Sequence, residues 1–127
     1  MVFATNETPI GFALGLGGLL IIAGIALWVV AQRTATGVLG RSQFVGIRTR
    51  STMASDQAWL AAHQAAQRAL QVAAVELGLT GAMAAVAGGN NDLLILILVV
   101  GTALMSGALA KAVIFATRAA RATDPTV

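Results

Sequence analysis

The sequence contains no cysteine or tyrosine, a single histidine and few charged residues. The absence of cysteine excludes disulfide bonds, thiolate metal sites and thiol nucleophiles, and one histidine cannot form a histidine metal cluster. Only 10% of the residues are charged, whereas 57% are hydrophobic. Soluble domains are about one quarter charged, because a small globule must keep most of its surface wet. The composition therefore predicts a protein that lies in lipid.

The components of common enzyme sites are also missing from the sequence. It has no phosphate-binding glycine motif before a Lys-Ser/Thr pair, no cluster of histidines and carboxylates, and no serine with a base and an acid at a recognisable spacing. We therefore predict a protein that is not an enzyme and that uses no metal or cofactor.

Two segments are long and apolar enough to cross a bilayer. Residues 10–31 and 93–110 contain no charge, and helices of these lengths extend about 33 and about 27 Å. A cleaved signal peptide is the alternative for the first segment. However, residues 1–9 contain no Lys or Arg, and the apolar run exceeds a typical signal-peptide core. Both segments are predicted to be transmembrane helices.

A third segment, residues 69–89, is mostly Ala, Val, Leu and Gly but contains Gln71, Glu76 and Thr80. The run GGNND at residues 88–92 is a strong turn signal, which would fold this segment back against the last one. We predict an all-α membrane protein with one domain and three transmembrane helices, the last two forming a hairpin. The predicted bounds are 10–31, 69–89 and 93–113 for the spans, 32–68 for the loop and 114–127 for a C-terminal tail.

The distribution of positive charge predicts the orientation of the chain. All Lys and Arg residues lie after the first span or at and after the end of the third: Arg33, Arg41, Arg48, Arg50, Arg68, Lys111, Arg118 and Arg121. Cytoplasmic loops hold the excess of Lys and Arg. We therefore expect the N-terminus outside, and the loop and C-terminus inside, the bacterial cytoplasmic (inner) membrane. Anionic lipid at the inner surface accounts for the net charge of +3, so no nucleic-acid partner is expected.

The second half of the loop predicts a helix. Ser55 and Asp56 suit its N-cap and first turn, and it would continue to Arg68. One face would carry Trp59, His63, Ala66 and Leu70. Such a helix is either a short amphipathic helix on the inner membrane surface or a cytoplasmic extension of the second span.

Residues 46–59 (GIRTRSTMASDQAW), with His63 four residues further on, resemble the signature loop of the SdpI family of small bacterial membrane proteins. The family pattern reads Asn-x-x-x-Gly-Ile-Arg-Thr, then Thr, Ser or Asn with an acidic residue, Trp and His, between a first and a second transmembrane helix. The matching positions are Gly46, Arg48, Thr49, Thr52, Ser55, Trp59 and His63. Three positions depart from the pattern: Ser42 replaces Asn, Arg50 replaces a frequent Pro, and Gln64 replaces a frequent basic residue.

The best-known members of that family are immunity proteins, which protect a cell from its own secreted peptide toxin and in some systems hold a transcriptional repressor at the membrane. The resemblance implies an immunity or envelope-stress factor that acts through its loop. Its partner would be a peptide toxin, another membrane protein or a second copy of the chain. Two alternatives remain open: a structural accessory subunit of a larger membrane complex, which Ala- and Gly-rich helices suit, and a small channel or proton-coupled transporter.

Four loop side chains each have a functional and a structural interpretation. Arg48 and Arg50 bind an anion or peptide carboxylate, or they lie on phospholipid headgroups. Trp59 organises the loop, or it anchors the chain at the membrane interface. His63 is a proton switch or a packed histidine.

Glu76 falls near the centre of the predicted bilayer, where ionisable groups often mark functional sites. Counted from the hairpin turn, Glu76 lies at about 16 Å, and Thr102 and Ser106 lie at about 14 and 20 Å. Lys111 lies at about 27 Å, too far along for an easy ion pair with Glu76. We predict an intramembrane polar cluster of Glu76, Thr80, Thr102 and Ser106, serving either transport or, as a neutral hydrogen-bonded group, helix packing.

Small residues recur at four-residue spacing in each span, and this spacing lets membrane helices approach closely. The stripes consist of Gly11 and Gly15, of Ala74, Gly78 and Ala82, and of Thr102, Ser106 and Ala110.

Overall fold

Three helices and their connections make up the computed structural model, which describes residues 8–42 and 44–123. Helix α1 spans Ile10–Ala35, α2 spans Asp56–Val86 and α3 spans Asn91–Thr123, and no strand occurs in these ranges. Each helix is long and apolar enough to cross a membrane. The prediction of an all-α, multi-pass membrane protein with three transmembrane helices is therefore confirmed. The last part of the predicted tail, residues 124–127, and the N-terminal residues 1–7 lie outside the described residues.

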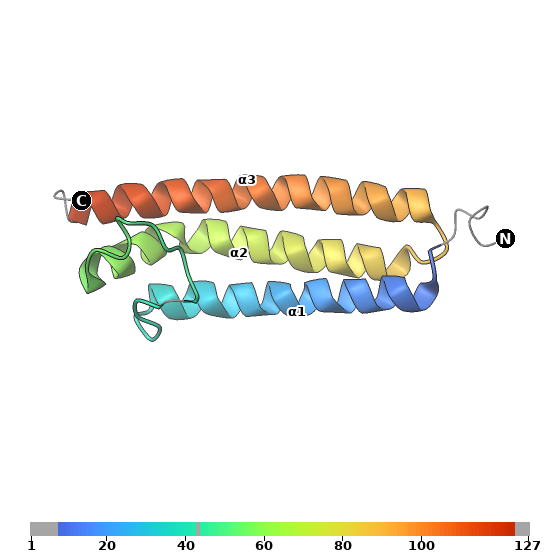
Figure 1. Cartoon of the computed structure of the whole chain (residues 1–127), viewed down its shortest axis with the longest axis horizontal. Helices are drawn as coiled ribbons and strands as arrows, with labels where there is room; N and C mark the ends of the chain where they lie inside the picture. The colour runs from blue at the N-terminus through green and yellow to red at the C-terminus, as the bar shows by residue number, and fades with distance from the viewer. Residues whose placement is uncertain (1–7, 43, 124–127) are drawn as a thin grey trace.

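The helices form a layer in which α2 lies between α1 and α3 (Figure 1) and packs against both. At one end of this layer, the loop end, α1 ends, α2 begins and α3 ends. Residues 36–55, which we call the loop, cover this end. The opposite end, the hairpin end, carries the turn between α2 and α3. Because α2 is the central helix, both the loop and the hairpin are positioned by it.

The turn at the hairpin end uses the predicted glycine and asparagine residues. Gly89 adopts a φ of +94°, which is favourable only for glycine, and its N–H donates to the Thr8 carbonyl at 2.9 Å. The Asn90 side chain accepts a hydrogen bond from the Leu93 N–H at 3.0 Å and so caps α3. The last two helices form the predicted hairpin.

The helices extend further at the loop end than the predicted spans. Helix α1 continues to Ala35, and α3 continues through much of the predicted tail to Thr123. The segment from Asp56 to Arg68 is not a separate short helix but the beginning of α2, as the second interpretation of that segment expected. The spans were inferred from the absence of charge, which locates the hydrocarbon region. An Ala-rich helix continues past that region because Ala has the highest helix propensity.

Three side chains mark the level at which the helices leave the hydrocarbon region. At 1.5 Å per residue, Trp28 lies about 27 Å from the start of α1, Arg68 about 27 Å from the end of α2, and Lys111 about 30 Å from the start of α3. All three distances are measured from the hairpin end and match the thickness of about 30 Å of a bilayer core. Trp, Arg and Lys are also typical of the membrane interface. His63 and the loop lie beyond this interface level, outside the hydrocarbon.

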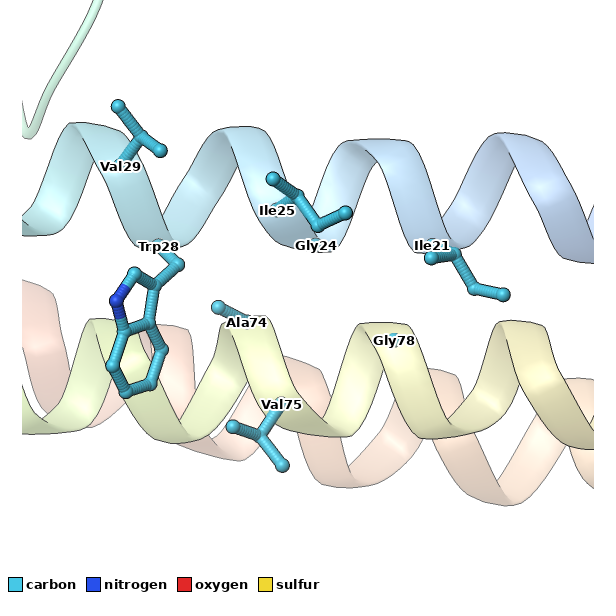
Figure 2. Close-up of a pocket in the computed structure, with 8 residues that line it drawn as sticks. All are labelled: Ile21, Gly24, Ile25, Trp28, Val29, Ala74, Val75 and Gly78. Atoms are coloured by element: carbon cyan, nitrogen blue, oxygen red, sulfur yellow. The ribbon is translucent and has the colours of Figure 1, made fainter.

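Glycines bring α1 and α2 into backbone contact. A methyl group at Gly24 would lie 2.8 Å from the Ala74 carbonyl oxygen, and one at Gly81 would lie 2.6 Å from the Gly17 carbonyl oxygen. In Figure 2, Gly24 faces α2, and the Trp28 indole reaches across to that helix. These side chains border a shallow apolar cavity of about 270 Å³.

The predicted stripe of Gly11 and Gly15 in α1 does not contact α2. Methyl groups at Gly11 and Gly15 would meet no atom within 4 Å, so these glycines face outward. Only glycines spaced on the α2 side of α1, Gly17 and Gly24, allow the close approach. In α2, Ala74 is buried as expected, whereas Ala82 is exposed.

Near the loop end, alanines allow the three helices to approach one another closely. The buried cluster there consists of Ala31, Ala58, Ala62, Ala66, Leu70, Ala112, Ala116 and Ala120. The α3 members recur every four residues, so α3 does use a small-residue stripe. The predicted stripe of Thr102, Ser106 and Ala110 lies instead on the exposed side of α3.

We expect Gly24→Ala to destabilise the protein by about 1–3 kcal/mol, because the new methyl group meets the backbone of Ala74 and Gly78, which cannot move aside easily. Gly15→Ala is the matched control on the same helix. Its methyl group enters open space, so it should not destabilise the protein and can stabilise it by up to about 1 kcal/mol through the higher helix propensity of Ala. Unfolding of both variants in detergent micelles, followed by circular dichroism, measures the difference. Equal stability of the two variants would contradict the glycine contact.

Candidate functional site

The candidate site is the loop, which folds back on the first turns of α2. The Gly37 backbone has a φ of +83° and turns the chain away from α1. The Gln64 side-chain amide of α2 donates to the Ala35 carbonyl at 3.2 Å, which attaches the end of α1 to α2. The loop therefore starts from a fixed point on α2.

Trp59 and His63 form the centre on which the loop is built. Their exposed fractions are 2% and 0%, and the centroids of their rings are 4.1 Å apart. The indole N–H donates to the Leu39 carbonyl at 3.0 Å. The imidazole Nε2 accepts from the Ile47 N–H at 2.9 Å. One turn of α2 thus binds the backbone of the loop at two points, near its beginning and near its middle.

Gly46 lies directly against these two rings. Its φ of +99° is in the left-handed region, and a methyl group at this position would lie 2.6 Å from the Trp59 ring and 2.9 Å from His63 Nε2. Both the backbone conformation and the available space therefore require glycine.

Thr49 and Thr52 close the following turn by reciprocal hydrogen bonds. The Thr52 hydroxyl oxygen accepts from the Thr49 N–H at 2.9 Å, and the Thr49 hydroxyl oxygen accepts from the Thr52 N–H at 3.2 Å. The buried Thr52 hydroxyl also donates to the Ile47 carbonyl at 2.7 Å. Ile47 thus uses both of its backbone polar groups within the site, the N–H on His63 and the carbonyl on Thr52.

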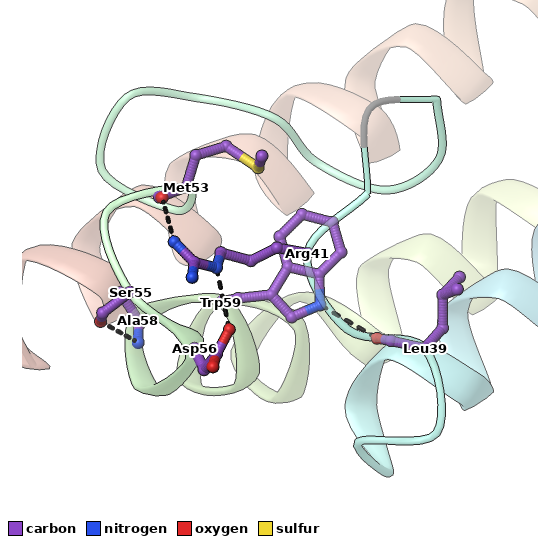
Figure 3. A network of polar contacts seen from close by, with 7 residues as sticks. All are labelled: Leu39, Arg41, Met53, Ser55, Asp56, Ala58 and Trp59. Atoms are coloured by element: carbon purple, nitrogen blue, oxygen red, sulfur yellow. Dashed lines mark hydrogen bonds and ion pairs between the residues drawn. The ribbon is translucent and has the colours of Figure 1, made fainter.

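The end of the loop is connected to α2 by the polar network in Figure 3. Ser55 caps α2 as predicted, since its hydroxyl oxygen accepts from the Ala58 N–H at 3.0 Å. The Arg41 guanidinium bridges the two sides of the loop: it donates to the Asp56 carboxylate at 2.8 Å and to the Met53 carbonyl at 3.1 Å. The Arg41–Asp56 pair is largely exposed, so its contribution is at most about 1 kcal/mol.

The loop also contacts α3. The Arg121 guanidinium donates to the Ser51 hydroxyl at 3.4 Å, a weak bond that nevertheless joins the last turn of α3 to a buried loop residue. No sequence pattern predicts this contact, because Ser51 is outside the matched signature positions and Arg121 belongs to the predicted tail.

The structure divides the signature residues into those that build the loop and one that faces outward. Six of them, Gly46, Thr49, Thr52, Ser55, Trp59 and His63, make the contacts described above. Ile47 and Thr49 point inward, whereas Arg48 and Arg50 alternate with them and are exposed. Phe44 and Val38, with exposed fractions of 88% and 75%, lie in the same loop. Sequence reasoning missed these two apolar side chains.

The hydrogen bonds of His63 define its neutral tautomer. Because Nε2 accepts from the Ile47 N–H, the proton is on Nδ1, which donates to the Trp59 carbonyl at 2.8 Å. Burial lowers the pKa of His63 from its ordinary value of 6.5, and this effect outweighs the hydrogen bond to Trp59, which acts in the opposite direction. Protonation at Nε2 would remove the acceptor for Ile47. A proton switch and a packing role for His63 are therefore compatible in this geometry.

The predicted intramembrane cluster is brought together only in part. The Thr80 hydroxyl donates to the Glu76 carbonyl of its own helix at 2.7 Å. Thr102 and Ser106 are exposed and line neither of the two α2–α3 cavities that Glu76 borders. The Glu76 Oε2 atom is buried and has no hydrogen-bond partner in the described part of the chain.

Comparison with known protein families identifies the family of the chain. The model of the SdpI/YfhL protein family matches residues 38–110, which is more than half of the chain. The chain belongs to this family. The match covers most of the loop, all of α2 and much of α3. No curated protein and no solved structure matched the chain.

We expect Gly46→Ala to detach the loop from Trp59 and His63. An alanine is unfavourable in the left-handed backbone conformation of this residue, and its methyl group would overlap both rings. The cost should exceed about 2 kcal/mol. Acrylamide quenching of Trp59 fluorescence, in a Trp28→Phe background, measures the exposure of the indole. Gly40→Ala is the control, since its methyl group would meet nothing within 4 Å. Equal quenching in the two variants would contradict the close approach.

We also expect acid to loosen the loop. Since the pKa of His63 is lowered in the folded state, its stabilising effect is complete above about pH 6.5 and is lost as the pH falls below that value toward the folded-state pKa. Trp59 quenching in the Trp28→Phe background should therefore increase below about pH 6.5. His63→Gln removes the titrating group, so this variant should show no such increase. An identical pH profile in the variant would assign the change to another group.

Proposed function

We propose that the protein acts by interaction, as an immunity or envelope-stress factor against a secreted peptide toxin. The observation that carries this proposal is the construction of the loop, in which the SdpI/YfhL signature residues support an exposed segment containing Arg48 and Arg50. In the orientation favoured by the positive-inside rule, the loop end lies in the cytoplasm. The exposed segment is then the recognition surface.

The chemistry of this surface indicates the kind of partner it suits. Arg48 and Arg50 are exposed and make no ion pair within the described residues. A guanidinium binds carboxylates in a bidentate manner, and the exposed Phe44 of the same loop offers an apolar contact. A peptide or protein partner with a carboxylate next to an apolar side chain fits this arrangement.

Arg48→Gln together with Arg50→Gln should abolish protection while leaving the fold intact, because neither side chain supports the loop. The measurement is survival of a deletion strain that carries each variant, under challenge with a panel of secreted peptide toxins and membrane-active compounds. Arg33→Gln with Arg118→Gln removes the same charge from two other exposed positions and should retain protection. The proposal fails if deletion itself leaves sensitivity unchanged across the whole panel.

A second candidate function is that of an accessory subunit in a larger membrane complex. The observation that favours it is the layered arrangement, in which α1 and α3 each pack on α2 and leave large apolar side chains exposed on their other sides. Purification in mild detergent at native expression, followed by mass spectrometry, separates the candidates. A partner of fixed stoichiometry supports the accessory role, whereas recovery alone or as a homo-oligomer supports the immunity role.

A further inference from the structure

A groove between α2 and α3 combines two cations with an apolar floor. It has a volume of about 690 Å³ and is partly open at the surface of the protein. Arg68 of α2 and Lys111 of α3 line it, together with apolar side chains that include Val72, Leu104 and Phe115. The two cations therefore come from different helices and border one space.

Both cations are placed to meet an anion at the membrane surface. Arg68 and Lys111 lie at the interface level, about 27 and 30 Å from the hairpin end, and both residues are exposed. Neither forms an ion pair or hydrogen bond within residues 8–42 and 44–123. A phosphate group at the level of lipid headgroups would neutralise both.

The groove continues into the hydrocarbon region as an apolar trough. A second cavity, of about 370 Å³, shares Glu76 and Leu104 with the first and continues along Leu79, Leu96 and Val100. From Arg68 to Leu79 the helix rises about 16 Å, close to half the thickness of about 30 Å of the hydrocarbon core. The cationic mouth and the trough together thus have the depth of one leaflet.

Glu76 does not oppose an anion at the mouth. Among the described residues, it is the only acidic one that lines either cavity. Its position is about 12 Å from Arg68 along α2, toward the hairpin end. A phosphate bound between Arg68 and Lys111 would therefore lie at the opposite end of the groove from this carboxyl group.

We propose that this groove binds one anionic phospholipid from the leaflet at the loop end. Its phosphate lies between the Arg68 guanidinium and the Lys111 ammonium, and one acyl chain follows the trough past Leu104. The site uses neither Arg48 nor Arg50, so it is independent of the proposed recognition surface.

Native mass spectrometry of the delipidated full-length chain tests the headgroup. We expect one phosphatidylglycerol per chain, bound about tenfold more tightly than phosphatidylcholine with the same acyl chains. Arg68→Gln with Lys111→Gln should remove this preference, whereas Arg33→Gln with Arg118→Gln, which removes the same net charge elsewhere, should keep it. The proposed site is overturned if the groove variant keeps its preference for phosphatidylglycerol, or if the control variant loses this preference to the same extent.

Two further measurements test the acyl part. Leu104→Trp fills the junction of the two cavities and should weaken phosphatidylglycerol binding, while Ile22→Trp, at an exposed position of α1 that borders no described cavity, should not. Glycerol 3-phosphate, added at the same concentration as phosphatidylglycerol, should not displace the bound phosphatidylglycerol. Displacement would show a site for free phosphate compounds and overturn the lipid assignment, as would equal binding by the two Trp variants.

Discussion

The contact of the Gly46 backbone with the rings of Trp59 and His63 determines how the rest of the loop is arranged. It places the Ile47 N–H on the imidazole, and the Ile47 carbonyl then accepts from Thr52. A segment of 20 residues between two helices has no ladder of backbone hydrogen bonds to fix its shape, so its buried polar groups need side-chain partners. The side chains of α2 and the loop threonines supply these partners. The shape of the loop is therefore a property of the first turns of α2.

That dependence explains why α2 extends beyond the membrane. Trp59 and His63 can hold the loop only if their helix is rigid outside the hydrocarbon region. The rigidity comes from a buried cluster at the loop end in which alanines of all three helices pack with Leu70. Ser55 begins this extension, and Arg121 links its α3 neighbour to the loop. The loop, the α2 extension and the end of α3 consequently form one unit.

The parts of the fold that the sequence predicted are those that follow from position along the chain. Charge-free length located the spans, Ser55 located the start of α2, and the spacing of Trp59 and His63 placed both on one face, which the structure shows to be buried. The sequence does not predict in the same way which face of each helix points toward its neighbour. The depths of Glu76, Thr102 and Ser106 agree, yet α3 turns the last two away because Ala108 and Ala112 face the core. Glycine, alanine, serine and threonine all suit a close helix contact, so composition alone does not select the stripe.

The positions that depart from the SdpI/YfhL pattern can be understood from the same geometry. Ser42 accepts from the Phe44 and Val45 N–H groups at 3.2 and 3.3 Å, a role that an Asn side chain also performs in turns. Gln64 donates to the Ala35 carbonyl, so a neutral amide serves to hold α1 here. Arg50 is exposed and supports no loop contact, so it adds a charge to the surface without altering the framework. Sequence change at such a position leaves the contacts that fold the loop in place. The fold of the loop is therefore expected to depend on the inward positions, such as Ile47 and Thr49, and to tolerate substitution at the outward positions Arg48 and Arg50.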